Sequence, residues 1–479
     1  MPDLRPPLYL IGLLVAALGA SMTLPMAVDW AAGNGHWGVF ASSAVITTLS
    51  GGLIALACAN GVTRKLTLQQ TFLLTTGVWV ALPLFAALPF VLGATGASAT
   101  DAFFEAMSGL TTTGGTVLTG LAGLPDGILL WRGLLQWFGG IGIIVVAMAL
   151  LPELKVGGMQ IFRAEAFDTD KVLPRAAAIA GRIAGIYIGL TGVCALTYLG
   201  FGMRPLDAAV HAMTTIATGG FANYDSSFAV FGPAIEWSAT LFMLLAALPF
   251  VRYVQFLNGE PAPLWRDPQI RAFLLVAATL IGAMTVWRWA VEPGDMSLRE
   301  TAFNVTSILT GTGYASSNYM LWGALPVAAF FFIGLIGGCA GSTSCSIKIF
   351  RYQLLFASIK AHIRRIHQPH GVFAPRYDGR PVGDDVLSSV MSFFVLFIGT
   401  LAIVTIGLGT TGLDLLTAVS GAATALANVG PGLGDVIGPA GNFAPLPDAA
   451  KWMLSAAMLI GRLEVLAVYV LFVPAFWRA

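Results

Sequence analysis

Charged residues are scarce in this chain: they make up 10% of its 479 residues, whereas soluble proteins carry about 25%. This scarcity excludes a water-soluble globular protein. Neither sign of charge dominates, since 25 Lys and Arg face 24 Asp and Glu, so nothing indicates a nucleic-acid partner or an acidic disordered tail. The few cysteines lack paired spacing, which predicts neither a disulfide framework nor a zinc site; they are Cys58, Cys194, Cys339 and Cys345.

The chain is rich instead in apolar residues and helix breakers. Hydrophobic residues make up 57%, with 56 Gly and 25 Pro. A membrane-spanning helix needs about 20 apolar residues, and runs of this length predict an all-α polytopic membrane protein with spans at 8–28, 36–58, 69–92, 130–152, 176–201, 233–256, 270–291, 323–350, 386–410 and 448–476. Because lipid cannot satisfy backbone groups freed by breakers, protein or a polar cavity must shelter the breaks.

The basic residues predict the orientation of these spans. With the N-terminus inside, 19 of the 25 Lys and Arg fall on the inner side, as cytoplasmic segments require. An even number of spans then places both termini in the cytoplasm. The five basic residues left on the outer side are Arg132, Arg204, Arg288, Arg299 and Lys451. Thirteen outer acids give that side a net charge of −8, which would concentrate cations at a mouth; the positive-inside bias alone could also produce this asymmetry.

A fourfold repeat joins the later spans on the outer side. Four segments are too short to span and too apolar for plain loops: 101–116, 207–222, 300–315 and 414–433. Each has an apolar helical first half, at 102–110, 208–216, 301–309 and 415–426, and a Gly-containing second half. When Gly114, Gly220, Gly313 and Gly430 are aligned, a hydroxyl stands six residues earlier in all four: Ser108, Thr214, Ser307 and Thr424. Such repetition usually identifies an architecture.

Acidic residues stand near the start of each short helix. Asp101, Asp207 and Glu300 lie thirteen residues before the aligned glycines, and Asp414 lies one turn before the equivalent Thr417. Carboxylates and hydroxyls there suit N-capping and the positive end of the helix dipole. We prefer this interpretation to a direct role as ion ligands.

The residues that enter the four glycines are candidate ion ligands through their backbone. Glycine and small residues permit an extended or positive-φ chain, so that rings of carbonyls can replace the hydration shell of a monovalent cation. The helices before them would point their negative ends inward, although they could instead be amphipathic surface helices. The candidates are Thr112, Thr113, Gly114, Thr218, Gly219, Gly220, Gly311, Thr312, Gly313, Asn428, Val429 and Gly430.

The sequences 111–114, 217–221, 310–314 and 428–433 resemble the four selectivity-filter loops of the Trk/Ktr/HKT superfamily of potassium transporters. The resemblance covers 60–479, and the preceding helix pair resembles the TrkH branch. It implies four span-loop-span units around one K⁺ pore, a homodimer, and a cytoplasmic ring of nucleotide-binding RCK subunits of the TrkA type. A serine in place of the first filter glycine goes with sodium permeation in that superfamily, so Gly114 implies potassium selectivity.

The resulting domain organisation has a helix pair at 1–60 and pore repeats at 61–152, 153–256, 257–350 and 386–479, with a cytoplasmic basic loop at 351–385. This loop holds Lys360, Arg364, Arg365, Arg376 and Arg380. It could bind anionic lipid or, as the resemblance implies, a regulatory subunit. The positive-inside bias is the alternative explanation of its charge.

A run of small and hydroxylated residues interrupts the second span of the third repeat. Helix propensity disfavours it, and a break within the membrane is tolerated where it lines a cavity; close helix packing is the alternative. The run resembles the intramembrane gating loop of the superfamily, except that Cys345 and Ser346 stand where glycines are usual. The candidate gate residues are Gly337, Gly338, Gly341, Ser342, Thr343 and Ser344.

Arg462 lies about fourteen residues into the last span, where a charge is costly. Glu464, two residues further on, faces another side of the helix. Arg462 must therefore meet the pore, a carbonyl cluster or another helix. It resembles the positively charged pore residue below the superfamily's filter; a buried structural contact with a neighbouring repeat is the alternative, and the two roles are compatible.

Two other classes of function were weighed. An enzyme is improbable because Ser342 and Ser344 have no histidine in their segment, His211 stands alone, and no His-Glu-x-x-His motif exists. A secondary carrier that couples cation uptake to Na⁺ or H⁺ is the better alternative, since broken helices also build carrier sites. All four repeats begin on the same side, which favours rotation about a pore axis over inversion. We therefore expect K⁺, the transported ion, to pass through a gated pore.

Overall fold

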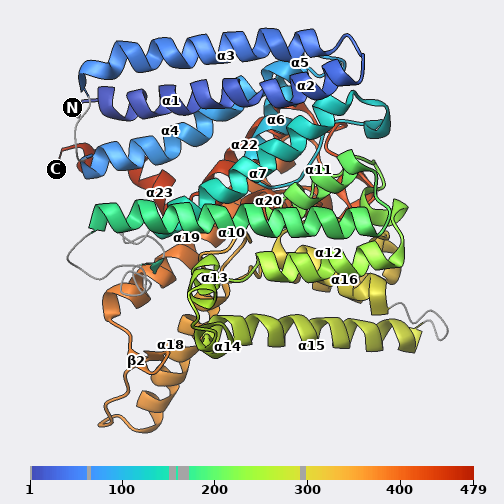
Figure 1. Cartoon of the computed structure of the whole chain (residues 1–479). Coiled ribbons are helices and arrows are strands. Elements are labelled where there is room, and N and C mark those ends of the chain that lie inside the picture. Colours follow the sequence, from blue (N-terminus) through green and yellow to red (C-terminus); the bar gives the residue numbers. More distant parts are fainter. Residues whose placement is uncertain (1–2, 62–65, 150–157, 160–171, 292–297, 479) are drawn as a thin grey trace.

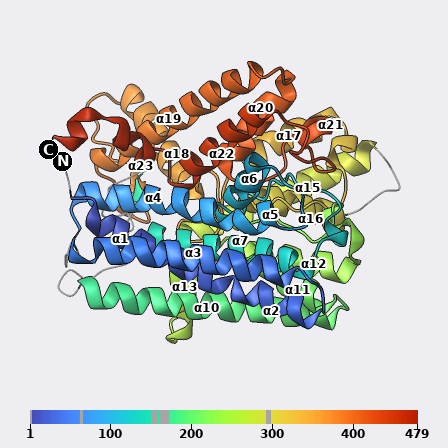
Figure 2. The same ribbon diagram turned by 90° about the horizontal axis from the view of Figure 1, so that it is seen from above.

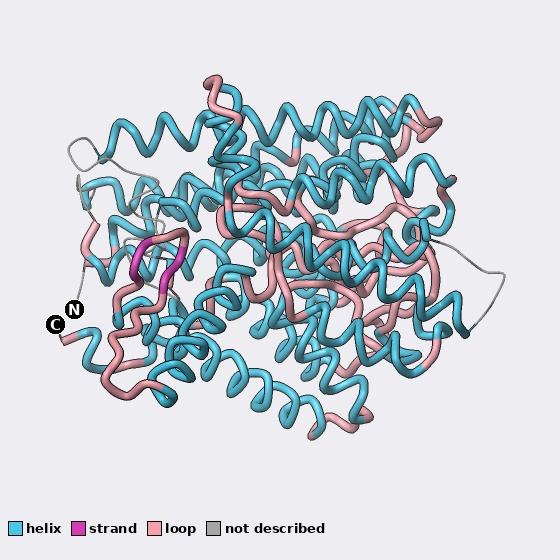
Figure 3. The backbone as a smooth tube through the Cα atoms, turned by 90° about the horizontal axis from the view of Figure 1, so that it is seen from below, coloured by secondary structure: helices cyan, strands magenta, loops and turns pink. Residues whose placement is uncertain are grey.

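The computed structural model describes residues 3–61, 66–149, 158–159, 172–291 and 298–478. Within these ranges the chain is nearly all helix, with one small hairpin formed by β1 (Arg376–Tyr377) and β2 (Arg380–Pro381) (Figures 1 and 3). The predicted all-α membrane class is confirmed. The prediction of which side of the membrane each charged residue faces includes seven residues outside the described ranges, namely Arg64, Lys65, Lys155, Arg163, Lys171, Glu292 and Asp295.

An N-terminal helix pair packs through small residues. It consists of α1 (Arg5–Ser21), continued by α2 (Thr23–Ala31), and α3 (Trp37–Cys58). A Cβ on Gly12 would lie 2.6 Å from the backbone nitrogen of Ala55. A Cβ on Gly51 would likewise collide with the backbone nitrogen of Ala16. Glycine on both sides therefore lets α1 and α3 approach, as is common where lipid supplies no hydrophobic driving force between helices. The two helices run side by side along one face of the molecule (Figures 1 and 2).

Four units follow, and each contains a long helix, a short central helix, a loop and further helices. The first is α4 (Leu68–Ala86), α5 (Leu88–Leu92), α6 (Ala99–Leu110) and α7 (Asp126–Ala149); the second is α10 (Val172–Gly200), α11 (Pro205–Ile216), α12 (Pro233–Ala246), α13 (Phe250–Leu257) and α14 (Ala262–Arg266). The third is α15 (Pro268–Val291), α16 (Leu298–Thr310), α17 (Ala324–Gly334) and α18 (Ile349–His367); the fourth is α19 (Asp384–Gly409), α20 (Leu415–Ala427), α21 (Gly434–Ile437), α22 (Asp448–Arg462) and α23 (Leu466–Tyr469).

One of the ten predicted spans does not form a helix long enough to cross a membrane, and it is the run in which the sequence predicts a break. The described residues contain seven helices long and apolar enough to span, and up to nine spans if two bent pairs count as one each. The run 323–350 is not among them: α17 ends at Gly334 and the chain is largely non-helical until Ile349. The small and hydroxylated residues here make bonds that a continuous helix would not permit.

Two other predicted spans are sharply bent. The helices α12 and α13 meet at 90°, and α22 and α23 meet at 105°. Pro249 precedes α13, and the residue before a proline disfavours the helical region. At the second bend Glu464 and Val465 both have positive φ, 61° and 59°, which is a rare conformation for a β-branched residue. The bends free backbone groups inside the protein, and the functional site uses them.

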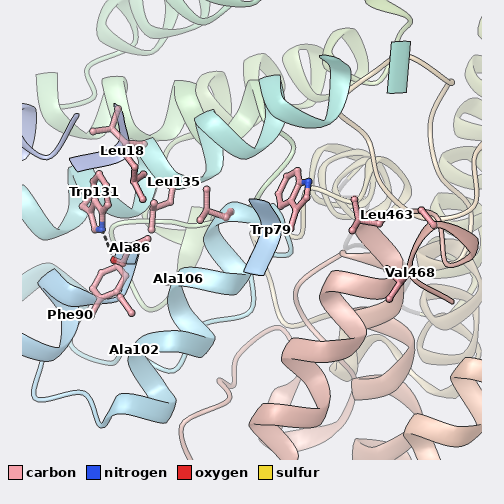
Figure 4. Packing of buried hydrophobic residues seen from close by; sticks show 14 of the residues in the cluster. Leu18, Trp79, Ala86, Phe90, Ala102, Ala106, Trp131, Leu135, Leu463 and Val468 are labelled. Carbon is pink, nitrogen blue, oxygen red and sulfur yellow. Dashed lines mark hydrogen bonds between the residues drawn. The ribbon is translucent and has the colours of Figure 1, made fainter. Parts of the chain in front are cut away.

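A core cluster joins the helix pair to the first and fourth units (Figure 4). It brings together Leu18 from α1, Trp79 from α4, Trp131 from α7, and Leu463 and Val468 from either side of the fourth unit's bend. The Trp131 indole donates a 3.0 Å bond to the carbonyl of Ala86, where α4 ends. The two termini and α18 lie at the same end of the molecule (Figure 1).

Candidate functional site

The four central helices, α6, α11, α16 and α20, end in the same motif. Two residues before each aligned glycine the backbone has positive φ: 53° at Thr112, 48° at Thr218, 75° at Gly311 and 53° at Asn428. The next residue donates its N–H to the carbonyl five positions back, as in a Schellman cap. These four bonds are Thr113 to Ser108, Gly219 to Thr214, Thr312 to Ser307 and Val429 to Thr424, at 2.8–3.0 Å. The aligned hydroxyl residues of the sequence therefore occupy equivalent structural positions.

The four aligned glycines form a closed ring, here called the glycine ring (Gly114, Gly220, Gly313 and Gly430). All four have positive φ, between 81° and 108°. A Cβ on Gly114 would meet the carbonyl oxygen of Gly219, one on Gly220 that of Thr312, one on Gly313 that of Val429, and one on Gly430 that of Thr113. Each loop thus contacts the next, and the fourth returns to the first. Glycine is required at every position for two reasons: the backbone is left-handed there, and the neighbouring loop approaches too closely for a Cβ.

Side chains behind the ring hold its loops. The hydroxyls of Thr111 and Thr113 lie 2.7 Å apart, and the equivalent pair in the third unit, Thr310 and Thr312, lies at the same distance. In the fourth unit the Asn428 amide donates 2.9 Å bonds to the Thr113 hydroxyl and to the Met458 carbonyl. Asn428 therefore joins the fourth loop to the first and to α22.

Gln136 is a functional residue that sequence reasoning missed. Its amide nitrogen donates a 2.5 Å bond to the Gly219 carbonyl, and its amide oxygen accepts a 3.0 Å bond from the N–H of Phe221. One side chain of α7 thereby fixes both sides of the second loop. A lone amide in an apolar span was the available signal, since polar residues within the membrane tend to be functional.

A cavity of about 470 Å³ opens on one side of the glycine ring. Its walls include Gly114, Gly220, Gly313 and, from the fourth loop, Pro431. Asp225 also lines it and accepts hydrogen bonds from the N–H groups of Gly120 and Leu121. The cavity thus reaches all four loops and carries charged side chains in its walls, among them Asp225 and Arg132.

The five basic residues predicted to lie outside all form ion pairs, most of them with central helices. The pairs are Arg132–Glu105, Arg204–Asp207, Arg288–Glu300, Arg299–Glu236 and Lys451–Asp101. The capping interpretation holds fully for Asp414, which accepts the N–H of Thr417 at 3.1 Å; this bonding lowers its pKa. Asp101, Asp207 and Glu300 stand instead in the first turn, where they favour the helix dipole.

Asp207 is held in its charged form by its hydrogen-bond donors. Burial would raise its pKa, but hydrogen bonds from Arg204, Asn223 and Tyr224 lower it overall. The charge is therefore kept at the positive end of α11, and the partners tie that end to the second loop.

On the other side of the ring, the loop at 335–348 fills the space between the units. The loop residues Cys339 and Thr343 donate their N–H groups to the carbonyls of Ala247 and Ala246, respectively. The bend between α12 and α13 frees these carbonyls. The Ser344 hydroxyl donates a 2.7 Å bond to the Thr310 carbonyl, at the end of α16. The loop thus contacts both the second unit and the base of the third filter-like segment.

The predicted gate residues lie together in this loop. A Cβ on Gly337 would meet the carbonyl of Cys345, one on Gly338 would lie 2.8 Å from the Cβ of Ser344, and Gly341 has a φ of 74°. The Ser342 hydroxyl donates to the Cys339 carbonyl at 2.7 Å. Ser346, where the superfamily has glycine, has a φ of 61° and bonds through its hydroxyl to the carbonyls of Gly334 and Ala427.

Arg462 reaches from the fourth unit towards this loop. Its guanidinium donates to the Cys345 sulfur at 2.8 Å and to the Gly139 carbonyl of α7 at 3.0 Å. Glu464 pairs instead with the buried Arg351 at the start of α18, as expected from its different face. Arg462 thus contacts a carbonyl and other helices, as predicted.

A closed ring of backbone at the centre of repeated membrane helices, with a polar cavity on one side and a packed loop and an arginine on the other, defines a membrane transport protein. The family model for TrkH, described as "Cation transport protein", matches residues 37–479. The chain belongs to this family, whose members are transporters and not enzymes.

Named relatives agree with this assignment. The chain is 52% identical to the Trk system potassium uptake protein TrkI of Halomonas elongata over 85% of this chain and 84% of that protein. It is 36% identical to the Trk system potassium uptake protein TrkH of Escherichia coli K12, over 98% of both. The crystal structure of the potassium transporter TrkH from Vibrio parahaemolyticus superposes with a TM-score of 0.90 over both whole chains, at 33% identity.

Replacing Arg132 by Leu should destabilise the protein strongly. Arg132 and Glu105 are both about fully buried, and Arg132 also donates to the Ala222 carbonyl; an unpaired buried charge costs about 3–5 kcal/mol. The thermal unfolding midpoint of the purified protein measures the loss. The matched control is Arg204→Ala: Arg204 is 62% exposed and Asp207 keeps two other donors, so about 1 kcal/mol or less is expected. Equal shifts in the two variants would contradict the prediction.

Proposed function

We propose that this protein is a K⁺ uptake permease that works as a channel-like pore. The single observation that carries the proposal is the glycine ring, in which four equivalent loops contact one another in a closed circle. The names of the relatives, potassium uptake proteins, supply the ion. The described residues contain no cluster of three or more His, Cys, Asp or Glu that could hold a metal ion, so backbone and hydroxyl oxygens are the available ligands.

In this proposal the selectivity filter consists of the predicted residues at and just before the ring: Thr112 to Gly114, Thr218 to Gly220, Gly311 to Gly313 and Asn428 to Gly430. Alternating positive and negative φ at these positions directs successive carbonyls so that they can replace water around a dehydrated cation. The central helices end immediately before the loops, so their negative ends add to the attraction for a cation. Partial charges bind the ion weakly enough for it to leave.

The loop at 335–348 and Arg462 form the proposed gate. The loop packs against the base of the filter through Ser344 and Thr310. Arg462 is 4% exposed, and among the described residues no carboxylate bonds to it, so its positive charge raises the barrier for a cation nearby. Conduction would require both to move, and α18, which begins directly after the loop, connects them to the end of the molecule where the termini lie.

The proposed orientation places both termini in the cytoplasm of a bacterium and the protein in the inner membrane. The proposed partners are a cytoplasmic nucleotide-binding RCK subunit of the TrkA type and a second copy of this chain. An exposed apolar stripe on α18 supports the homodimer: it consists of Phe356, Ile359, Ile363 and Ile366, spaced as the seam of a packed helix pair requires.

A secondary carrier that couples cation uptake to Na⁺ or H⁺ is the alternative, and ion flux separates it from a pore. Purified protein in liposomes should take up Rb⁺ down its gradient without a Na⁺ or proton gradient. The uptake rate should stay proportional to the Rb⁺ concentration well above the concentrations at which carriers usually saturate. The initial uptake rate measures this. Uptake that saturates early and stops when the Na⁺ and proton gradients are collapsed would support the carrier.

Gly114→Ser should relax discrimination between K⁺ and Na⁺. Gly114 has a φ of 86°, and a Cβ would collide with the Gly219 carbonyl, so the ring must open at this point. A loss of about 1.4 kcal/mol in selectivity corresponds to about tenfold in the permeability ratio. Competition of Na⁺ with Rb⁺ uptake measures it. The matched control is Gly120→Ser, because Gly120 also has positive φ but open space around it; unchanged ion ratios in Gly114→Ser would count against the filter.

Arg462→Ala should raise the cation flux of the protein without preventing folding. The substitution removes a positive charge from the pathway, and it loses two hydrogen bonds that involve no carboxylate. Rb⁺ uptake and the unfolding midpoint are measured on the same preparations, with the exposed Arg266→Ala as control. If the only effect is a lower yield of folded protein, the purely structural role of Arg462 is correct.

A further inference from the structure

The thiol of Cys345 lies where three of the four units meet. Its sulfur is 2.8 Å from a guanidinium nitrogen of Arg462 in the fourth unit and 3.5 Å from the hydroxyl of Thr112 in the first. A Cβ added to Gly311, in the proposed filter loop of the third unit, would lie 3.3 Å from the Cβ of Cys345. The side chain is 5% exposed. The thiol is therefore enclosed directly between the proposed filter and the arginine of the proposed gate.

Arg462 has few other anchors. Of its nitrogens, one bonds to the Gly139 carbonyl, and the buried Nε has no hydrogen-bond partner among the described residues. The Trp79 ring lies further away, with its centre 5.6 Å from the guanidinium carbon. The sulfur of Cys345 thus supplies one of two close hydrogen-bond acceptors that fix the position of this charge.

The hydroxyls of the residues beside Cys345 contact other groups, and among the described residues none of them is recorded in a bond to Arg462. The Ser344 hydroxyl donates to Thr310, and the Ser346 hydroxyl donates to Gly334. The Thr343 hydroxyl donates to Ala246. Cys345 is the residue through which the side chains of the loop hold Arg462.

We propose that Cys345 is a positioning residue that holds the Arg462 guanidinium beneath the filter and so keeps the pore closed. The inference rests on the proposed gate and adds a component to it. A glycine at this position, as in the superfamily's usual loop, has no side chain to accept the bond. The thiol therefore gives this chain a direct link between its loop and its arginine, and the two elements must move together or separate when a cation passes.

A double-mutant cycle tests this link. The purified full chain is reconstituted into liposomes without a partner, and the Rb⁺ leak is measured for the wild type, Cys345→Ala, Arg462→Ala and the double variant. Cys345→Ala should raise the leak by roughly tenfold or more, because it removes a hydrogen bond to a charged group. It should add nothing in the Arg462→Ala background, since the thiol would act through the arginine alone.

Two further variants separate positioning from simple packing. Cys345→Ser retains an acceptor and should restore a leak close to that of the wild type. Cys58→Ala removes a buried thiol at the end of α3, in the helix pair outside the four units, and should leave the leak unchanged. If Cys345→Ala does not fold, Cys345→Val takes its place in the cycle, since valine fills similar space and accepts no bond.

The outcomes are distinguishable. A raised leak in Arg462→Ala with a wild-type leak in Cys345→Ala overturns this inference and leaves the proposed gate intact. Independent, multiplying effects of the two substitutions also overturn it. A wild-type leak in Arg462→Ala overturns the gate and this inference with it. Rescue by serine together with a non-additive cycle supports it.

Discussion

The interior of this protein depends on broken helices that satisfy one another. Backbone N–H and C=O groups within a membrane must find partners inside the protein. The bend after Ala247 frees carbonyls that loop 335–348 uses, and in return the N–H of Phe250 donates to the carbonyl of Gly341. The carbonyl of Ala427, at the end of α20, accepts the N–H of Ser346. No single break would be stable alone, so the loop, the bends and the ring form one cooperative structure.

The four units share a backbone motif but are supported differently. All four central helices end in the same cap, and the first and third loops share the same pair of hydroxyls. The second loop depends on Gln136 and the fourth on Asn428. In the first and fourth units a glycine of a later helix lies against a carbonyl at the end of the central helix: Gly139 against that of Leu110, and Gly461 against that of Leu426. The ring requires equivalence only of the backbone, so each unit is free to supply its own side-chain support.

The sequence predicts the ring well because its requirements are local. Positive φ and close approach both demand glycine, so the aligned glycines and the hydroxyls six residues earlier give the register directly. Gln136 and the partners of the five outer basic residues could not be predicted, since pairs such as Lys451 and Asp101 are distant in sequence and nothing local encodes them. The break at Gly337 was predicted from composition, but the 105° bend after Arg462 depends on two residues, Glu464 and Val465, that have no intrinsic preference for positive φ.

That bend explains how Arg462 can reach the first unit. The chain bends by 105° between Arg462, where α22 ends, and Leu466, where α23 begins. The carboxylate that could have neutralised the arginine, Glu464, is turned towards Arg351 on α18. The guanidinium is left with a sulfur and a carbonyl as acceptors, both of which carry only partial charge. Under the proposed function, a cation arriving from the filter repels a charge that is held by two hydrogen bonds and the nearby Trp79 ring. A carboxylate partner would bind the arginine more strongly, and it would also attract the permeating ion; its absence lets the gate be both closed at rest and displaceable.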